Sequence, residues 1–477
     1  MSEILMKCID LEKSKNGLIK KWGYKHPEKL YEEETYRTNF RRQRDRILYT
    51  GGFRRLQDKT QVISAMKSGD HRTRLTHTLE VEQIAISLSD ALGLNSDLVS
   101  AIACGHDVGH TPFGHAVERA LNKKLNKQGG FSHAIQSVKY LNEKMRKDKT
   151  PKKVQKLQDL IFEGILKHDT DVYVGDYDNR QWDCSQYKLD EAGTLEMQVV
   201  YWADKIAYLT HDFEDFYNTE IYLHAKKNYP QLEVELKTIL AELTKNPKIK
   251  KNIKLFETRN LIRNIIAQLI DQSKKNIKSK TLKPNGIRIE TTRLIKEEEL
   301  KQAKKEKEDS AVEVNYVEYL EVNKIKELEA QLEDIKKRND KDQQELVDST
   351  IKTVKKIKKN AYMDCLMINF TDEYRKNYKE LRKLLDDYYI FSPEITRSDA
   401  KAEKIANCLF DDFVANIRLL PLNIRKRIKD KDNNNDNEPV GANSKERIVA
   451  DYIASMTDRY AEVIYTDLNA IGGNYDY

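Results

Sequence analysis

The sequence predicts an all-α protein, and three observations lead to that prediction. Glycine (18 residues) and proline (9 residues) are scarce in a chain of 477, although a sheet protein needs turn residues to separate its strands. Lysine, glutamate, leucine and isoleucine dominate the composition, as is typical of helical proteins. Apolar residues also recur at helical spacing along several segments. Charged residues make up 34% of the chain, and we expect most of them on solvated helix faces.

The charge balance and the cysteines narrow the class of protein. The chain has 84 lysine and arginine residues and 77 aspartate and glutamate residues, which gives a net charge of +7. This small excess fits either solvated helix faces or an anionic ligand or nucleic acid. The five cysteines lie far apart and show no metal-finger or redox spacing. No apolar run is long enough for a signal peptide or approaches the ~20 residues of a membrane span. We therefore expect a cytoplasmic protein with no membrane partner.

Two consecutive helices are expected in the first quarter of the chain. The first begins near Thr76, and its apolar residues keep helical spacing as far as Leu92. A Gly-Leu-Asn-Ser break at 93–96 is suited to cap the second helix. That helix is expected over 97–104 and ends just before a His-Asp pair.

Later segments are expected to be helical as well. Pro112 is suited to the first turn of a helix that carries His115. A long amphipathic helix is expected over 195–216, and a single final helix over 444–465.

Two stretches stand apart in composition. Residues 296–360 are rich in alternating charges and predict a projecting helical hairpin or short coiled coil, supported by exposed ion pairs. This segment either decorates the fold or serves as a binding arm. The run KDKDNNNDNEP at 429–439 predicts a loop.

Histidines and carboxylates gather in a way that predicts a metal site. Six of the ten histidines fall between positions 71 and 133, and several lie in GHDVGHTPFGHAVE at 105–118. Four of the candidate ligands lie on or beside three expected helices. His77 lies near the start of the first helix, His106 and Asp107 directly follow the second, and Asp204 lies within the third. Two imidazoles and two carboxylates suit Mn²⁺, Fe²⁺, Co²⁺ or Mg²⁺ better than a structural zinc. For adjacent His and Asp to reach one ion the chain must leave regular geometry, which Gly105 and Gly109 permit.

The helix that carries Asp204 shows a polar stripe at helical spacing. The stripe comprises Asp204, Tyr208, His211 or Asp212, and Asp215, while apolar residues occupy the other faces. Such a stripe either faces water or lines a charged pocket.

Six segments together resemble one family. They are GGFRRLQDKTQV (51–62), RLTHTLEVEQIA (74–85), GHDVGHTPFGHAVE (105–118), GGFSHAIQS (129–137), LEMQVVYWADKIAYLTHDFED (195–215) and DYIASMTDRYA (451–461). In this order they resemble the dGTPase-like deoxynucleoside triphosphate triphosphohydrolases of the HD-domain superfamily. The charge-rich middle of the chain matches nothing in that pattern.

The resemblance implies a reaction and its catalytic groups. His77, His106, Asp107 and Asp204 would bind a divalent metal, Mn²⁺ or Mg²⁺ first, with Fe²⁺ or Co²⁺ as alternatives. Water would attack the α-phosphorus of a dNTP, with dGTP as the first guess, and release deoxynucleoside and inorganic triphosphate.

His115 would be the catalytic histidine with Glu118 as its carboxylate partner, and His110 would line the same pocket. The i,i+3 spacing places His115 and Glu118 on one helix face, which suits this partnership. The alternative for Glu118 is an ordinary first-turn glutamate that offsets the helix dipole.

The resemblance also implies residues that bind the substrate. Those that would contact phosphates are Arg74, His133 and Lys205. Those that would surround the sugar 3′-hydroxyl are Gln61, Tyr208 and Asp212, and Tyr389 (or its neighbour Tyr388) would wall off the 2′ position. Where some relatives have a second acidic residue after the histidine of GGFSH, this chain has Ala134.

The predicted organisation has three parts: an N-terminal segment with the HD-domain core (1–220), a charge-rich helical insertion (221–370) and a C-terminal helical region that completes the core (371–477). By analogy we expect a homo-oligomer, a tetramer or hexamer, with a nucleotide effector and single-stranded nucleic acid as further candidate partners. Two alternatives remain: an HD-domain phosphohydrolase of another nucleotide, and a nucleotide- or nucleic-acid-sensing protein whose HD site is regulatory.

Overall fold

The part of the chain that the computed structural model describes is helical, which confirms the predicted all-α class. The described residues are 37–61, 72–146, 150–169, 181–187, 189, 193–253, 256–281, 366–433 and 444–469. Within these ranges β-pairing is limited to one isolated bridge between Thr60 and Thr73. None of the described helices is both long and apolar enough to cross a membrane.

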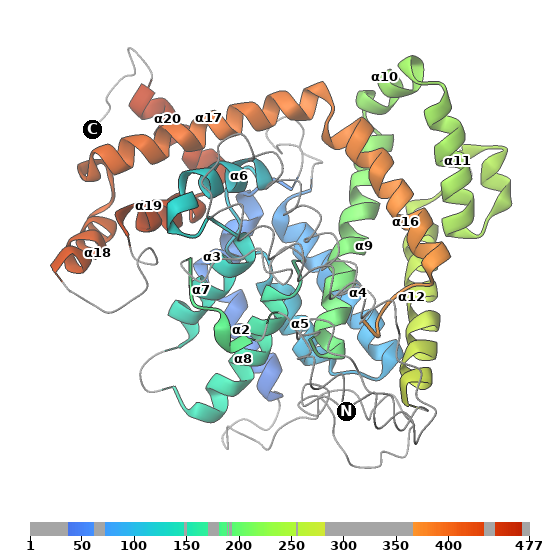
Figure 1. Cartoon of the computed structure of the whole chain (residues 1–477), viewed down its shortest axis with the longest axis horizontal. Helices are drawn as coiled ribbons and strands as arrows, with labels where there is room; N and C mark the ends of the chain where they lie inside the picture. The colour runs from blue at the N-terminus through green and yellow to red at the C-terminus, as the bar shows by residue number, and fades with distance from the viewer. Residues whose placement is uncertain are drawn as a thin grey trace, which may run out of the picture.

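Three helices form the centre of the molecule: α4 (Arg74–Leu92), α5 (Ser96–Gly105) and α9 (Leu195–Tyr217) (Figure 1). Their apolar faces share one large core, on which further helices pack from the sides. The surrounding N-terminal helices are α2 (Asn39–Leu48), α3 (Gly51–Arg55), α7 (His133–Met145) and α8 (Lys152–Leu166).

The helices predicted for this centre are confirmed. The first begins two residues earlier than expected, because Thr73 accepts a hydrogen bond from the backbone of Thr76 and forms a capping box with it. It ends where Gly93 adopts a left-handed conformation (φ 69°), which glycine does at little cost.

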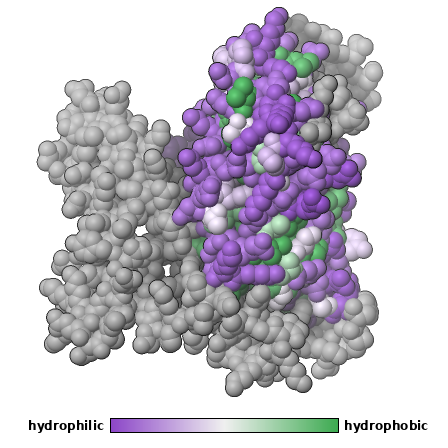
Figure 2. Space-filling model, turned by 90° about the vertical axis from the view of Figure 1, so that its right-hand side faces the viewer, coloured by the Kyte–Doolittle hydropathy of each residue, from purple (hydrophilic) through white to green (hydrophobic). Residues whose placement is uncertain are grey.

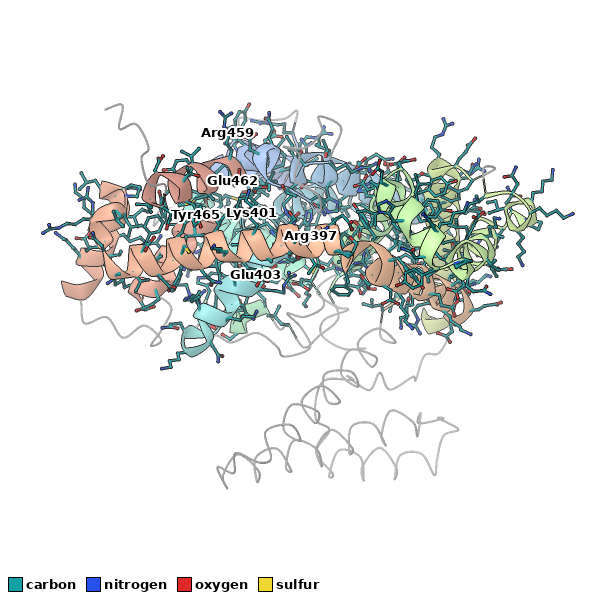
Figure 3. The ribbon with its side chains drawn as sticks, turned by 90° about the horizontal axis from the view of Figure 1, so that it is seen from above. Arg397, Lys401, Glu403, Arg459, Glu462 and Tyr465 are labelled. Atoms are coloured by element: carbon teal, nitrogen blue, oxygen red, sulfur yellow. The ribbon has the colours of Figure 1, made fainter. Side chains whose placement is uncertain are left out.

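A second, smaller core joins one early helix to the end of the chain. Helix α6 (His115–Lys124) packs against α17 (Pro393–Ala415) and shares its apolar cluster with α19 (Lys445–Ala454) and α20 (Asp458–Asn469). Figure 3 shows α17 and α20 running side by side, and Lys401 on α17 pairs with Glu462 on α20 at 2.9 Å. The helix that carries His115 therefore belongs to a different core from the helices that carry the predicted metal ligands.

Two local predictions are wrong in this region. Pro112 does not lie in the first turn of a helix, since α6 starts at His115 after a turn that includes Gly114 (φ 62°). The single final helix is two helices, because the chain turns at 455–457 and restarts at Asp458.

The remaining described helices lie on one side of the centre or at the C-terminal end. These are α10 (Glu220–Asn228), α11 (Gln231–Thr244), α12 (Thr258–Thr281), α16 (Asp372–Leu385) with a π-helical turn (Asp386–Ile390), and α18 (Leu422–Asn433). The outer face formed by α10, α11, α12 and α16 is mainly hydrophilic, with apolar residues in small separate areas (Figure 2).

The two segments of unusual composition are only partly described. Residues 429–433 belong to α18, so the loop predicted over 429–439 is wrong for its first part, and its remainder lies outside the described residues. The charge-rich segment 296–360 lies wholly outside them. The three-part division of the chain remains a prediction.

Candidate metal and catalytic centre

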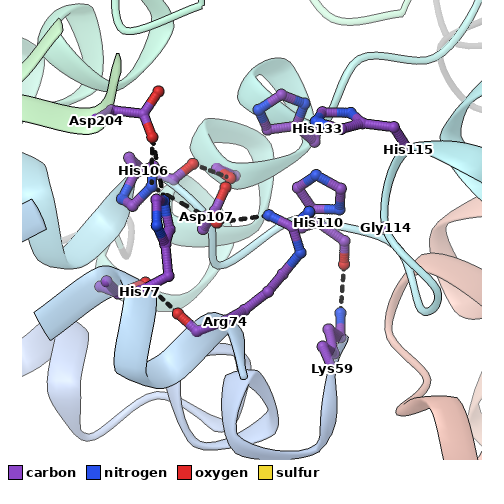
Figure 4. A network of polar contacts seen from close by, with 12 residues as sticks. Lys59, Arg74, His77, His106, Asp107, His110, Gly114, His115, His133 and Asp204 are labelled. Atoms are coloured by element: carbon purple, nitrogen blue, oxygen red, sulfur yellow. Dashed lines mark hydrogen bonds and ion pairs between the residues drawn. The ribbon is translucent and has the colours of Figure 1, made fainter. Parts of the chain in front are cut away.

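The four predicted metal residues come together from three helices (Figure 4). His77 lies in the first turns of α4, His106 and Asp107 follow the end of α5, and Asp204 lies within α9. His77 Nε2 is 3.1 Å from Asp204 Oδ1, and His106 Nε2 is 3.5 Å from Asp107 Oδ2 and 3.9 Å from Asp204 Oδ1. Three side chains are buried, and that of Asp204 is only 13% exposed.

The donor atoms of this cluster fit a divalent cation. His106 Nδ1 donates to the carbonyl of Ala103 at 2.7 Å, which leaves Nε2 with a lone pair. Among the described residues this buried Nε2 has no hydrogen-bond partner. Burial alone would raise the pKa of the Asp107 carboxyl, but Arg74 and the neighbouring histidines hold it well below its usual range. Lys205 and His77 do the same for the pKa of Asp204, so both carboxylates are ionised as metal ligands must be.

The glycines of the GHDVGH stretch act differently from the prediction. Gly105 and Gly109 are not among the described residues with positive φ, so the chain does not need them for a left-handed turn. A Cβ on Gly109 would lie 2.2 Å from the backbone nitrogen of Ser137, and one on Gly105 would lie 2.6 Å from the Ile165 side chain. These glycines therefore permit the close approach of α7 and α8 to the His-Asp pair.

A second cluster of polar side chains lies beside the first. Glu118 Oε2 accepts from His115 Nδ1 at 2.7 Å, and its Oε1 accepts from His133 Nδ1 at 2.9 Å and from the His133 backbone at 2.7 Å. The imidazole of His110 stacks on that of His133 at 4.6 Å between ring centres. The i,i+3 pairing predicted for His115 and Glu118 is therefore present, and Glu118 is more than a glutamate that offsets a dipole.

The charges of this second cluster follow from burial and from Glu118. Burial would raise the pKa of the Glu118 carboxyl, but His133 and His115 hold it well below its usual range. Although burial opposes it, Glu118 raises the pKa of His133 to about 9. Burial and then Arg74 lower the pKa of His110 well below its usual value, so His110 is neutral. The His115 side chain is 53% exposed, so its ring is the accessible one of the group.

Two predicted phosphate-binding cations border the metal cluster. Arg74 is buried and donates from Nη1 to Asp107 at 2.6 Å, while its Nε and Nη2 have no partner within the described part of the chain. A Cβ on Gly114 would lie 3.5 Å from Arg74 Nη2, so the free donor points toward the loop that precedes His115. Lys205 is 3.3 Å from Asp204 Oδ2. Both cations therefore lie beside carboxylates of the first cluster.

Residues predicted for the sugar subsite share a network with Arg382, which the sequence analysis did not single out. Arg382 donates to Asp212 at 2.7 Å and to the Tyr208 hydroxyl at 2.8 Å, and its guanidinium lies 4.1 Å from the centre of the Tyr208 ring. Tyr389 is fully buried, and its hydroxyl has no partner among the described residues. The polar stripe of α9 is thus largely buried instead of facing water.

Gln61 lies next to the loop that precedes His115. Its backbone oxygen is 3.3 Å from the position that a Cβ on Gly114 would take. Its buried Oε1 has no hydrogen-bond partner in the described structure. This acceptor is therefore available to a ligand hydroxyl.

The loop between the clusters is held by two residues far apart in sequence. Asp458, at the start of α20, accepts from the Phe113 backbone at 2.8 Å and from the Thr60 backbone at 2.9 Å. Phe113 has a positive φ of 55°, which costs energy in a residue other than glycine. The buried Lys59 ammonium donates to the carbonyl of His110 and, at 2.8 Å, to that of Ala454. The C-terminal helices thereby fix the turn from which His110 and His115 project.

Two family models match the chain. An HD domain matches residues 74–209, and a phosphohydrolase-associated domain matches residues 368–467. A deoxyguanosinetriphosphate triphosphohydrolase-like protein of Rickettsia bellii (strain RML369-C) is 31% identical over 459 residues, which cover 94% of this chain and 96% of the relative. Proteins of the same description from Rickettsia peacockii (strain Rustic) and Rickettsia conorii (strain ATCC VR-613 / Malish 7) are each 33% identical over 453 residues, which cover 92% of this chain and 94% of each relative.

The chain belongs to the deoxyguanosinetriphosphate triphosphohydrolase-like HD-domain phosphohydrolases. The HD-domain match of this phosphohydrolase begins at Arg74 and ends after Asp204, so it includes all four clustered metal residues. The associated-domain match includes Arg382 and Asp458. The second domain of the phosphohydrolase therefore contributes residues to the surroundings of the site.

Sequence reasoning missed several residues near the centre of this phosphohydrolase. They are Lys59, His168, Asp169, Arg382 and, as a site residue, Asp458. His168 is a single histidine at the end of an amphipathic helix, and neither spacing nor a neighbouring motif marks it. The contact between Asp458 and Phe113 spans 345 positions, and no local pattern predicts a contact of that range.

Proposed function

We propose that this phosphohydrolase hydrolyses deoxynucleoside triphosphates at the α-phosphorus and releases deoxynucleoside and inorganic triphosphate, with dGTP as the first substrate. The observation that carries the proposal is the accessible His115, oriented by Glu118 and placed beside a buried His-His-Asp-Asp cluster. The relatives are deoxyguanosinetriphosphate triphosphohydrolase-like proteins, which supports dGTP among the four dNTPs.

His115 is the proposed general acid and base. Glu118 fixes the proton on His115 Nδ1, because an ionised carboxylate only accepts hydrogen bonds. The Nε2 atom is then the one that takes or gives a proton at the reacting phosphate. A divalent cation held by His77, His106, Asp107 and Asp204 would polarise a phosphoryl oxygen and lower the pKa of the attacking water.

The triphosphate is proposed to lie between the two clusters. Among the described residues, two donor nitrogens of Arg74 have no partner there, and they can bind phosphate oxygens in parallel. His110 is buried with both ring nitrogens unpartnered within the described residues, so a phosphate oxygen would satisfy its proton-bearing nitrogen. Lys205 adds a second cation at the edge of the metal cluster.

The deoxyribose is proposed to lie against Gln61, Tyr208 and Asp212. Arg382 holds the Tyr208 hydroxyl and the Asp212 carboxylate in fixed positions, so both are oriented before a sugar arrives. A buried site built to bind the 3′-hydroxyl disfavours analogues that lack it, because its own polar groups are then left unpaired. Tyr389 is proposed as the wall at the 2′ position.

Product analysis tests this function. The purified chain with Mn²⁺ or Mg²⁺ is incubated with each of the four dNTPs, alone and mixed, and with GTP as the matched ribonucleotide. Water attack at the α-phosphorus predicts deoxyguanosine and inorganic triphosphate from dGTP in equal amounts and in one step. Formation of dGMP with pyrophosphate, or of dGDP with phosphate, contradicts the proposed reaction.

Asp458→Asn is expected to lower kcat for dGTP by about 10²-fold without removing the metal, because a small misplacement of catalytic groups has that effect. The amide can replace only part of the carboxylate, which accepts from both Phe113 and Thr60. The measurement is kcat together with metal content and melting temperature. Asp430→Asn, in the exposed surface of α18, is the matched control. A kcat equal to that of the wild type in folded Asp458→Asn would show that this anchor does not position the loop.

A further inference from the structure

Glu80 lies on the same face of α4 as the metal residue His77, about one turn further along the helix. We propose that Glu80 is a positioning residue for the metal site: its carboxylate accepts the Nδ1 proton of His77 and so fixes the ring that would bind the cation through Nε2. The inference rests on the metal site of the proposed function, but not on its substrate or its products. Neither the sequence motifs nor the family resemblance assigns a role to Glu80.

The first observation is that His77 needs a hydrogen-bond acceptor. His77 Nε2 lies 3.1 Å from Asp204 Oδ1, on the side of the metal cluster, so a neutral ring that binds a cation there carries its proton on Nδ1. His77 Nδ1 is buried and has no hydrogen-bond partner among the described residues. A buried donor without an acceptor is costly, and histidine ligands usually donate their second ring proton to a carboxylate or a carbonyl.

Within the described residues the backbone does not supply this acceptor. His106, the other histidine of the cluster, donates from Nδ1 to the carbonyl three residues earlier, that of Ala103. The equivalent carbonyl for His77 belongs to Arg74, and it already accepts from the Thr78 hydroxyl at 2.8 Å. A side-chain acceptor on the same helix face is therefore needed.

Glu80 offers such an acceptor. Its Oε2 atom is buried and lies 2.9 Å from His211 Nε2 and 3.5 Å from Arg72 Nε, but it has no well-aligned hydrogen bond within the described part of the chain. Burial alone would raise the pKa of the Glu80 carboxyl, but His211, Arg72 and His77 hold it below its usual value. The carboxylate is therefore ionised and can only accept hydrogen bonds.

Two neighbours hold this carboxylate in place. Arg72 also pairs with Asp215 at 2.9 Å and with Glu214, which ties the start of α4 to the last turn of α9. His211 lies on α9, and its ring meets that of His77 edge-on at 5.9 Å between ring centres. The carboxylate is thus bordered by a fixed guanidinium and by two imidazoles, of which only one belongs to the metal cluster.

The orientation of the His77 ring decides where its Nε2 lies relative to the other three donor groups. A carboxylate behind a histidine ligand fixes the tautomer and the orientation of the ring and raises its basicity. Loss of such an outer contact weakens metal binding about 10–100-fold. A salt bridge that only supports the fold would, in contrast, leave metal affinity unchanged when one partner is removed.

Cobalt binding without nucleotide tests the inference. The full chain is stripped with a chelator and titrated with CoCl₂, and visible absorption gives the dissociation constant and the ligand-field spectrum of the bound ion. Glu80→Gln keeps the side-chain volume but removes the charge, so we expect about 10–100-fold weaker Co²⁺ binding and a shifted spectrum. Glu214→Gln is the matched control, because it also takes a carboxylate from Arg72, and it should bind Co²⁺ as the wild type does.

Wild-type affinity and spectrum in folded Glu80→Gln would overturn the role of Glu80, and so would equal weakening in Glu214→Gln. Melting temperatures identify the folded variants. If Glu80→Gln does not fold, Glu80→Asp decides, since it keeps the charge but is one methylene shorter, and an unchanged affinity would refute the proposal. A wild type that binds no Co²⁺ would remove the metal site and this role together, whereas the products formed from dGTP are measured separately.

Discussion

Asp107→Ala is expected to lose bound metal and to lower kcat/KM for dGTP by about 10³-fold or more. Asp107 contributes one of the four donor groups of the cluster. A metal in such a site stabilises the transition state by several kcal/mol. Each ~1.4 kcal/mol of that stabilisation raises the rate tenfold. The measurement combines steady-state turnover with metal content after desalting.

The same substitution removes the carboxylate that pairs with buried Arg74, and an uncompensated buried charge costs about 3–5 kcal/mol. Asp107→Asn preserves the volume and one acceptor oxygen, so this second variant separates metal loss from unfolding. Asp430→Ala on exposed α18 is the control and should retain both metal and turnover. Full metal content with full activity in folded Asp107→Asn would exclude Asp107 as a ligand.

His115→Ala is expected to keep its metal and to lower kcat by about 10²–10⁴-fold, the usual contribution of a general acid–base group. His115 is the accessible histidine of its cluster, and it contacts Glu118 but none of the four metal residues at hydrogen-bond distance. Turnover, metal content and dGTP affinity measured on one preparation distinguish a catalytic group from a ligand.

Two further variants make the His115 test more specific. Glu118→Gln should lower kcat as well, because a glutamine amide no longer holds the proton on His115 Nδ1 so strongly. The exposed His224→Ala should behave as wild type. Loss of bound metal in His115→Ala would make His115 a ligand and would refute its proposed role.

Glu118 illustrates a prediction that needed little tertiary information. The i,i+3 spacing of His115 and Glu118 already places both side chains on one helix face. The structure adds that Glu118 also accepts from His133, which comes from another helix and fixes the carboxylate between two imidazoles. Its second partner comes from tertiary contact and not from helical spacing.

The helical class, the central helices α4, α5 and α9, and the residues of the buried His-His-Asp-Asp cluster could all be predicted from the sequence. Helical periodicity and capping depend on neighbours within a few positions, and the motifs keep their order along the chain.

The groups that complete and hold the site depend on contacts between separate helices. His168 faces His133, Arg382 orients Asp212, and Asp458 anchors Phe113 across 345 positions. The role of Gly109 is also a matter of packing, because the obstacle to a side chain is the backbone of α7. The physical reason is common to all of these: contacts between separate helices depend on how their apolar faces pack into two cores, and that packing leaves no periodic signal at the polar residues that it brings together.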